Sequence, residues 1–365
     1  MTLDLARLAP MDVAGRLGRL QSVLADHHID SLVVTNLVNI AYLTGFTGSA
    51  GTLVVSSDTA LLITDGRYTT QSHEQVEASG ADLDIVISAQ PLDEVASRDL
   101  GAIGCETDSI ALAAAMRLTQ AVGRDLTPTS GVVEMLRSHK DAGEIARIQA
   151  AATIATTALH TLEPMLSNSP SEIQFAQALD AKMRELGASS PSFETIVASG
   201  PHSALPHARP TQRLIGRGEP VVIDFGARVD GYCSDMTRTR CVGTPDDEMR
   251  NIFDAVAHAQ RDGVAAIRDG VAAAAIDAAC RTVLTDAGLS EYFTHGTGHG
   301  VGLDIHEHPR IAASSSDVVE TGQVVTVEPG VYVPGRGGVR IEDAVVVTEV
   351  GCDIVTTANY AFDLS

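Results

Sequence analysis

Five ionisable residues of this chain lie inside apolar or glycine-rich runs, where a charged side chain is hard to explain structurally. Asp224 directly follows Val221-Val222-Ile223, and Glu328 directly follows Val324-Val325-Thr326-Val327. The full set is Asp224, Asp235, His299, Glu328 and Glu342. Carboxylates are rarely buried unless they are paired or bind a metal, and four converging carboxylates would repel one another unless two divalent ions neutralised them. The set therefore predicts a two-metal hydrolytic site.

Length and composition describe an ordinary globular chain with a strongly acidic balance. The 365 residues suggest two domains, and 44% hydrophobic with 20% charged residues is typical of a globular fold. The formal net charge of −22 argues against a nucleic-acid partner or an anionic membrane, since either calls for a basic patch. No apolar run of about 18 residues predicts a membrane-spanning helix, and residues 1–10 lack the pattern of a signal peptide.

Cysteine usage indicates a reducing compartment. The five cysteines form no CxxC pair, and their number is odd. This pattern fits buried thiols better than a disulfide framework, so we expect a cytoplasmic protein.

Residues 1–130 are predicted to form an α/β domain. Short apolar strands alternate with helical patterns, beginning with an amphipathic stretch from Ala14 to His28. The expected strands are Ser31–Thr35, Thr52–Ser56, Ala60–Thr64, Asp84–Ser88 and Ala102–Glu106. The segment Leu126–Gly131 is rich in turn formers and marks a boundary with a second domain, residues 131–365.

The second domain is predicted to repeat one arrangement, two helices followed by a β-hairpin. Its first helix begins with Asp141 and Glu144 at capping-box spacing. Its second helix is expected to have Ser169 as N-cap, Pro170 at the first helical position and Glu172 closing a capping box. The recurrence of this order suggests a pseudo-symmetric domain that contributes one metal-binding hairpin from each half.

The first hairpin, Val221–Thr239, carries two of the acidic residues. Asp224 and Asp235 lie on either side of the turn signal Asp230-Gly231. Residues opposite each other in an antiparallel pair point to the same face, with Cβ atoms about 5 Å apart. We therefore expect Asp224 and Asp235 to be opposite each other and to share a pair of ions.

The second hairpin, Val324–Thr348, carries the other two. Glu328 and Glu342 bracket the loop Pro334–Gly338 in the same manner. Arg340 is two residues before Glu342, so on a strand it would point to the same face and could hydrogen-bond a ligating carboxylate.

One imidazole among oxygen ligands indicates a transition metal. His299 lies in the run His295–Gly302, whose glycines let the backbone come close to a ligand. Such a ligand set suits Mn²⁺, Co²⁺, Zn²⁺ or Fe²⁺ better than Ca²⁺ or a thiolate-rich structural zinc. Two ions about 3.5–4 Å apart would hold a bridging water with a lowered pKa and would polarise a carbonyl, so the chemistry implied is hydrolysis.

Other patterns in the same regions allow simpler interpretations. Asp224-Phe-Gly226 is like the kinase Asp-Phe-Gly motif, but no catalytic loop or β3 lysine accompanies it. The glycine run has neither Rossmann nor P-loop spacing. Taken singly, His207 and Arg310 are equally compatible with exposed loop residues.

Several short motifs together resemble the Xaa-Pro peptidases, the family of prolidase and aminopeptidase P, which shares the pita-bread fold with methionine aminopeptidase. The motifs are Pro206-His207, Ile223–Ala227, Ser234–Thr239, His295–Gly302, Ile305–Glu307, Val327–Gly330 and Arg340–Asp343. The resemblance implies an α/β N-terminal domain, like the smaller domain of these enzymes, followed by an α+β pita-bread (creatinase/aminopeptidase-like) catalytic domain. It also implies a homodimer.

The resemblance assigns a role to each predicted ligand. Asp224 is implied to chelate one metal, and Asp235 and Glu342 are implied to bridge the two. His299 and Glu328 then complete the second metal, with Glu328 also shuttling a proton for the attacking hydroxide.

Four further residues receive roles from the same resemblance. His207 and His306 are implied to bind the substrate and stabilise the tetrahedral intermediate. Arg340 matches an arginine that supports the ligands. Arg310 resembles the arginine that binds the substrate carboxylate in some prolidases.

The resemblance favours a prolidase, which hydrolyses Xaa-Pro dipeptides by attack of a metal-bridging hydroxide. Two divalent ions per chain are implied, with Mn²⁺ preferred and Co²⁺ or Zn²⁺ as alternatives. A dipeptidase must neutralise the substrate's C-terminal carboxylate near the metals, and an arginine suits that task. The alternative enzyme is aminopeptidase P, which releases the N-terminal residue from longer Xaa-Pro peptides. The alternative from another class is a catalytically silent pita-bread binding module.

Overall fold

The computed structural model describes residues 4–364, which form two compact units. The smaller unit is Met11–Arg137, and the larger combines Met1–Pro10 with Ser138–Ser365. Within residues 4–364, no helix is both long enough and apolar enough to cross a membrane.

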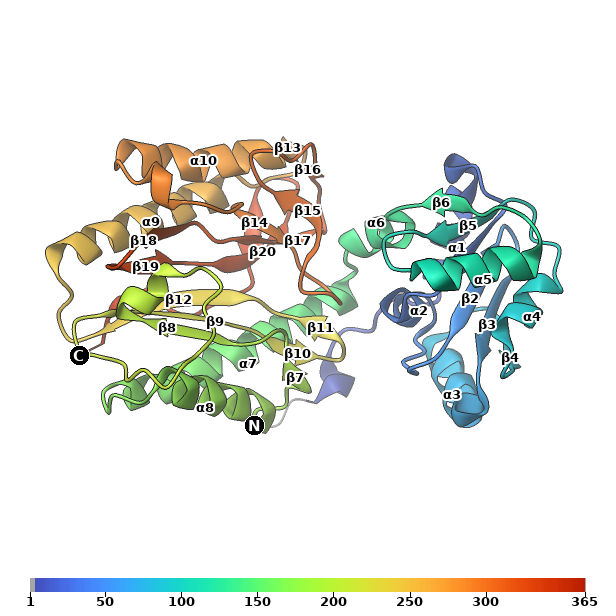
Figure 1. The fold of residues 1–365 in the computed structure, drawn as a ribbon, viewed down its shortest axis with the longest axis horizontal. Coiled ribbons are helices and arrows are strands. Elements are labelled where there is room, and N and C mark those ends of the chain that lie inside the picture. Colours follow the sequence, from blue (N-terminus) through green and yellow to red (C-terminus); the bar gives the residue numbers. More distant parts are fainter. Residues whose placement is uncertain (1–3, 365) are drawn as a thin grey trace. The chain divides into compact units, whose positions relative to one another are not determined.

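The smaller unit contains a six-stranded mixed sheet in the order β4-β3-β2-β1-β5-β6 (Figure 1). Its strands are β1 Ser31–Val34, β2 Thr52–Ser56, β3 Ala60–Thr64, β4 Asp84–Ile87, β5 Ile103–Glu106 and β6 Thr127–Thr129. Strand β1 pairs antiparallel with β2 and parallel with β5. Val33, Val54 and Ile63 on one face form a core with Val95 and Leu118 from two helices. The predicted strands β1 to β5 are confirmed within one residue at each end.

The helices of the smaller unit include some that the sequence analysis did not identify. They are α1 Arg16–Val23, α2 Leu37–Thr44, α3 Thr69–Ser79, α4 Pro91–Ala96, α5 Leu112–Val122 and α6 Val132–Ser138. Helix α2 begins at the N-cap Asn36, whose side chain accepts a hydrogen bond from the amide of Val38. The segment Leu126–Gly131, predicted to mark a domain boundary, contains β6, which pairs parallel with β5.

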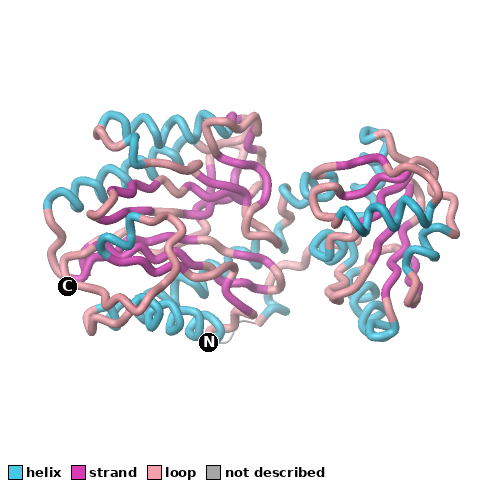
Figure 2. The backbone as a smooth tube through the Cα atoms, in the orientation of Figure 1, coloured by secondary structure: helices cyan, strands magenta, loops and turns pink. Residues whose placement is uncertain are grey.

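The larger unit consists of two halves with the same kinds of elements, each with two helices and a sheet. Figure 2 shows its strands between helical layers. The helices are α7 Ala142–Leu166 and α8 Glu172–Glu185 in the first half, and α9 Asp247–Ala266 and α10 Ala273–Asp286 in the second. One apolar cluster joins α7 and α8 to the first sheet, and another joins α9 and α10 to the second.

The two main sheets of the larger unit are ordered β22-β12-β9-β8 and β15-β14-β17-β20-β21. The first comprises β8 Ile196–Ser199, β9 Pro220–Phe225, β12 Met236–Val242 and β22 Asp363–Leu364. The second comprises β14 Gly298–Gly300, β15 Glu307–Ile311, β17 Val324–Val327, β20 Asp343–Val347 and β21 Cys352–Ile354. Shorter ladders are formed by β7 Ser190–Pro191, β10 Ala227–Val229, β11 Tyr232–Cys233, β13 Val271–Ala272, β16 Val318–Val319, β18 Gly330–Val333 and β19 Gly337–Arg340.

Helix starts in the larger unit confirm one prediction and correct another. The capping box of Asp141 and Glu144 at the start of α7 is present. The predicted start of α8 is wrong, because Ser171 is the N-cap and Gln174 closes the box. Ser169 has a positive φ of 49° and lies before the helix. Glu172 is therefore not the reciprocal partner of a cap, and its carboxylate is free to serve elsewhere.

Candidate metal centre

The first acidic hairpin differs from the predicted register by two residues. In the β9–β12 pair, Asp224 lies opposite Thr237 rather than opposite Asp235. The reason is the turn, in which Asp230 and Gly231 both have positive φ, 49° and 87°, as a two-residue type I′ turn requires. This turn places the centre of the hairpin between residues 230 and 231. Because the shift is even, Asp224 and Asp235 still belong to the same face.

The second acidic hairpin is divided into two ladders. β17 pairs with β20, ending at Val327 opposite Asp343, and β18 pairs with β19, ending at Gly330 opposite Arg340. The same register continued through the gap would put Glu328 opposite Glu342. Both glutamates thus lie at the interruption, where backbone atoms are released from the ladder and the side chains can turn towards a common point.

Side chains from both hairpins and from β14 converge on one small volume. Asp235, His299 and Glu342 each offer a ligand atom, and these atoms lie within 4.8 Å of one another. His299 Nε2 is 3.6 Å from Asp235 Oδ2 and 3.6 Å from Glu328 Oε1. His299 Nδ1 is 3.0 Å from the carbonyl oxygen of Gly300, which can only accept, so Nδ1 carries the proton. The unprotonated Nε2 therefore faces the carboxylates, as metal ligation requires.

The electrostatics of this cluster fit divalent cations. Burial, followed by the charges of nearby carboxylates, raises the pKa of Asp235 and of Glu328 well above the usual values. Burial and Asp224 raise the pKa of Glu342 to about 8, and burial lowers the pKa of His299 to about 4. No hydrogen bond within residues 4–364 reaches the buried Oδ1 atoms of Asp224 or Asp235. Bound cations would offset the negative charge of the cluster and would give these two oxygens a binding partner.

Arg340 connects the ligands to their surroundings. Its Nη2 donates to Asp224 Oδ2 (2.5 Å), and its Nε donates to Thr237 Oγ1 (3.0 Å). Thr237 Oγ1 in turn donates to Glu342 Oε2 (2.7 Å). The Nη1 of Arg340 donates to Tyr332 Oη at 2.6 Å. One fully buried guanidinium thus orients a carboxylate from each hairpin.

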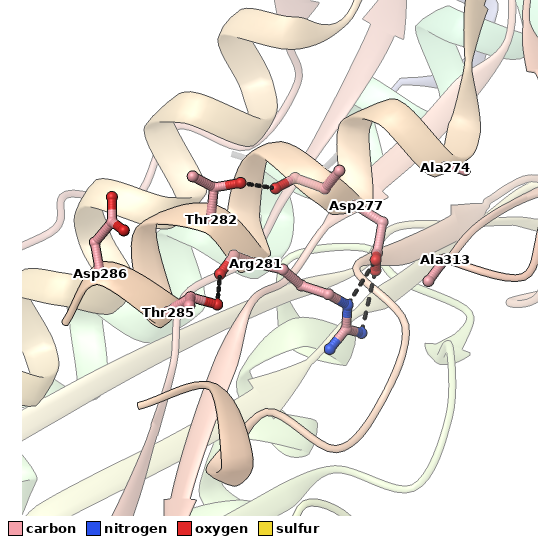
Figure 3. Close-up of a pocket in the computed structure, with 8 residues that line it drawn as sticks. Ala274, Asp277, Arg281, Thr282, Thr285, Asp286 and Ala313 are labelled. Carbon is pink, nitrogen blue, oxygen red and sulfur yellow. Dashed lines mark hydrogen bonds and ion pairs between the residues drawn. The ribbon is translucent and has the colours of Figure 1, made fainter. Parts of the chain in front are cut away.

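Helix α10 carries Asp277 and Arg281, which are paired with each other (Figure 3) and also contact the segment that leads into β14. Asp277 is fully buried, and its Oδ1 accepts from Thr297 Oγ1 at 2.9 Å. Arg281 donates to both oxygens of Asp277 and to the carbonyl oxygens of Phe293 and His295. The carbonyl oxygen of Thr297 accepts from the amide of Glu328 at 2.7 Å. The helix therefore fixes the backbone next to two of the proposed ligands.

The structure gathers the other predicted site residues at the rim of the cluster. The imidazole rings of His306 and His299 are 4.4 Å apart between centroids. Burial, with a smaller contribution from His207, lowers the pKa of His306, so the two rim histidines are electrostatic neighbours. Arg310 is exposed on β15 and lies opposite His299 in the β14–β15 pair, which puts both on one face of the sheet.

Three hydrogen-bonding residues of the site were not identified from the sequence. Thr237 could have been found, because it is two residues after Asp235 on a predicted strand and so shares its face. Tyr332 and Thr326 gave no comparable signal. Tyr332 binds Arg340 from another strand, and Thr326 Oγ1 accepts from the amide of His299 at 3.0 Å.

Comparison with known proteins decides the family. Residues 146–349 match metallopeptidase family M24, and residues 16–139 match the creatinase/prolidase N-terminal domain. The chain belongs to metallopeptidase family M24. The predicted fold is confirmed, an N-terminal α/β domain followed by a pita-bread catalytic domain, and the chain is a metal-dependent hydrolase by family.

Three relatives of this M24 protein align with nearly its whole length. An Xaa-Pro dipeptidase of Pyrococcus furiosus is 34% identical over 345 residues, 93% of this chain and 97% of the relative. The structure of an Xaa-Pro dipeptidase from Bacillus anthracis is 39% identical, covers 96% of this chain and 100% of its own, and superimposes with a TM-score of 0.92. The structure of an X-Pro aminopeptidase from Thermotoga maritima is 33% identical, covers 95% and 100%, and gives a TM-score of 0.86.

Proposed function

We propose that this chain is a di-metal Xaa-Pro dipeptidase. The observation that carries the proposal is the convergence of Asp235, His299 and Glu342, with ligand atoms within 4.8 Å of one another in a buried acidic cluster. The similarity to dipeptidases of two organisms over nearly the whole chain supports the choice of substrate.

The five proposed ligands would hold two divalent ions per chain. They are Asp224, Asp235, His299, Glu328 and Glu342. When bound, the ions would supply a nucleophile that is active at neutral pH and would polarise the scissile carbonyl. Mn²⁺ is the proposed ion, since oxygen donors with one imidazole suit it, and Co²⁺ or Zn²⁺ are the alternatives.

The remaining side chains would orient the substrate and move its protons. We assign proton transfer to Glu328, whose side chain is 18% exposed, whereas that of Asp235 is 6% exposed. His207 and His306, both exposed at the rim, would donate hydrogen bonds to the oxygen that becomes negative in the transition state. Arg340 would orient Asp224 through the hydrogen bond from its Nη2.

Selectivity for dipeptides is assigned to Arg310. A dipeptide places its carboxylate one residue beyond the scissile bond, and Arg310 lies on the same sheet face as His299. We expect Arg310→Ala to lower kcat/KM for Ala-Pro by about 10- to 100-fold, the equivalent of one charge-assisted hydrogen bond, and to change Ala-Pro-Ala much less.

The test is hydrolysis of Ala-Pro and Ala-Pro-Ala by Mn²⁺-loaded wild type and Arg310→Ala, with Lys182→Ala as a surface-charge control. Equal losses for the two peptides would remove the role of Arg310. Turnover of only the tripeptide by the wild type would identify an aminopeptidase P. Absence of both activities and of bound metal would identify a silent binding module.

The assembly of the protein and its location in the cell complete the proposal. The homodimer is proposed from the family resemblance, and light scattering after gel filtration measures it. A cytoplasmic location is supported by five cysteines without disulfide partners, four of them buried.

A further inference from the structure

Glu172 has a buried carboxylate with an unusually complete set of hydrogen-bond donors. It is the first residue of α8 and is fully buried. Its Oε1 accepts from the amide and the hydroxyl of Ser199, both at 2.8 Å. Its Oε2 accepts from the amide of Thr211 (3.1 Å), from Thr211 Oγ1 (2.6 Å) and from His202 Nδ1 (2.9 Å).

Four of these five donors come from the two ends of one segment, and the fifth, His202, lies between them. Ser199 is the last residue of β8, and Thr211 lies beyond the following 3-10 turn, Gly200–Ala204. His207 lies in the middle of the segment 199–211. The α8 backbone adds to the closure, because the amides of Ile173 and Glu172 donate to the carbonyl oxygens of Thr211 and Arg213, each at 3.0 Å. The carboxylate therefore ties both ends of the His207 loop to one point.

The middle of the loop is held against the metal centre by a separate contact. Arg340 Nη1 donates to the carbonyl oxygen of Pro206 at 3.1 Å, directly before His207. Ser203 Oγ accepts from the amide of Gly338 at 2.8 Å. With its ends fixed by Glu172 and its middle fixed by Arg340, the loop has little freedom to change the place of His207.

A carboxylate is costly to bury, so a fully buried glutamate at a helix start needs a reason. Helix α8 does not require it, because Ser171 and Gln174 already cap the helix. Arg213 is the nearby cation, and it is bound to Glu219 and to Ser199 Oγ. The hydrogen bonds that the Glu172 carboxylate accepts all come from Ser199, His202 and Thr211, which lie within the loop or at its ends.

We propose that Glu172 is a positioning residue for the reaction, which closes the loop 199–211 and thereby fixes His207 at the rim of the metal centre. The kinetic consequence of this inference rests on the proposed function. The closure of the loop by Glu172 does not depend on it. A displacement of a catalytic group by about 1 Å can cost about 100-fold in rate.

The matched variants are Glu172→Gln and Asp180→Asn. Glutamine keeps the size of the side chain but replaces one acceptor oxygen with an NH₂ group, so donors at one end of the loop lose their partner. Asp180 lies on the same helix, and its Oδ1 accepts from Thr195 Oγ1 (2.6 Å), outside the loop. Both changes remove one carboxylate from α8.

The first readout is hydrogen exchange of peptides covering residues 199–211, which needs no activity. For Glu172→Gln we expect exchange in this segment to be accelerated more than exchange in β17 and β20, whose amides report only the overall loss of stability. We expect no such difference between the segments for Asp180→Asn. Unchanged exchange in 199–211, or the same acceleration in 199–211 as in β17 and β20, would overturn the proposal.

The second readout is kinetic. We expect Glu172→Gln to lower kcat/KM for Ala-Pro by about 10- to 100-fold, with unaltered Mn²⁺ affinity. In a His207→Ala background the same change should cost little more, because the effect acts through His207. Additive losses would overturn the positioning role. If the wild type hydrolyses no Xaa-Pro peptide, the proposed function fails, and the exchange experiment alone decides the closure by Glu172.

Discussion

Asp235 has unfavourable surroundings for a buried carboxylate if no cation is bound. Burial, Glu342, Asp224 and Glu328 all raise its pKa, and only the more weakly acting Arg340 opposes them. Its Oδ1 has no hydrogen-bond partner among the described residues. The residue costs the fold free energy unless an ion compensates it, which is the pattern expected when side chains are placed for function.

Removing this carboxylate tests its use. We expect Asp235→Asn to lower the rate of Ala-Pro hydrolysis by at least about 100-fold, because one of the proposed metal ligands is lost, while the metal-free protein stays folded. The measurements are initial rates, bound Mn²⁺ by elemental analysis, and the thermal midpoint of metal-free protein. Wild-type activity with full metal content would contradict the assignment.

Glu172 gives a prediction about pH. Burial alone would raise its pKa, but hydrogen bonds from Thr211 and Ser199 outweigh that effect and lower the pKa below the usual 4.5. A lowered folded-state pKa means that the stabilisation is complete above about pH 4.5 and is lost as pH falls through the folded-state pKa.

The wild type should therefore exceed Glu172→Gln in unfolding free energy by roughly 2 kcal/mol at pH 7, a value typical of hydrogen bonds to charged groups. The difference should shrink as pH falls below about 4.5. Urea unfolding of both proteins between pH 3 and pH 7 measures it. A difference that is constant with pH would show that the charge of Glu172 contributes nothing.

At the scale of elements, sequence patterns predicted which segments are helices and strands better than how they meet. The strands from Ser31 to Glu106 and the cap of Asp141 follow from local rules. The register of the first acidic hairpin did not, because it depends on the positive φ of Asp230. The start of α8 was misplaced because Ser169 and Ser171 both precede acceptable capping partners, and tertiary contacts of Glu172 decide between them.

Helix α10 gives a prediction of its own. Asp277 accepts a hydrogen bond from the hydroxyl of Thr297, and Arg281 donates to the carbonyl oxygen of His295, so the helix would support the proposed ligands His299 and Glu328. We expect Asp277→Asn to weaken Mn²⁺ or Co²⁺ binding by about 10- to 100-fold, as is common for groups that orient ligands.

The control for this variant is Asp286→Asn, which changes an exposed residue of the same helix; Asp277 and Asp286 both line one pocket beside α10 (Figure 3). It should bind metal like the wild type. Calorimetric titration of metal-free protein gives both affinities. Equal affinities for Asp277→Asn and the wild type would show that α10 does not orient the ligands.

At the scale of the whole molecule, the division of the chain can be tested by fragments. The boundary at residue 130 stays a prediction, whereas the smaller compact unit ends at Arg137. Residues 131–137 make two hydrogen bonds with the fully buried Asn39. Arg137 Nη1 donates to Asn39 Oδ1 (2.7 Å), and Asn39 Nδ2 donates to Glu134 Oε1 (2.7 Å).

A fragment of residues 11–137 should unfold cooperatively. A fragment of residues 11–130 leaves Asn39 without these partners, and its thermal midpoint should be lower by roughly 5–10 °C. Circular dichroism during heating compares them. Equal midpoints would favour the boundary at residue 130.

More of the candidate site than of the fold could be predicted from the sequence, because the residues of the site are chemically conspicuous. Charged residues in apolar runs identified the five candidate ligands, and the motifs around them identified the family, which the comparisons confirm. Arg340 was predicted and Thr237 could have been, but the other supporting groups could not. Asp277, Tyr332 and Glu172 are ordinary residues of helices and strands, and only the tertiary fold brings them to Thr297, Arg340 and the His207 loop.

The most direct test of the two-metal dipeptidase is the rate of Ala-Pro hydrolysis as Mn²⁺ is added stepwise to metal-free protein. We expect the rate to rise from near zero and to reach its plateau at two ions per chain. Full activity in the metal-free protein, or no hydrolysis of Ala-Pro at any Mn²⁺ concentration, would contradict it.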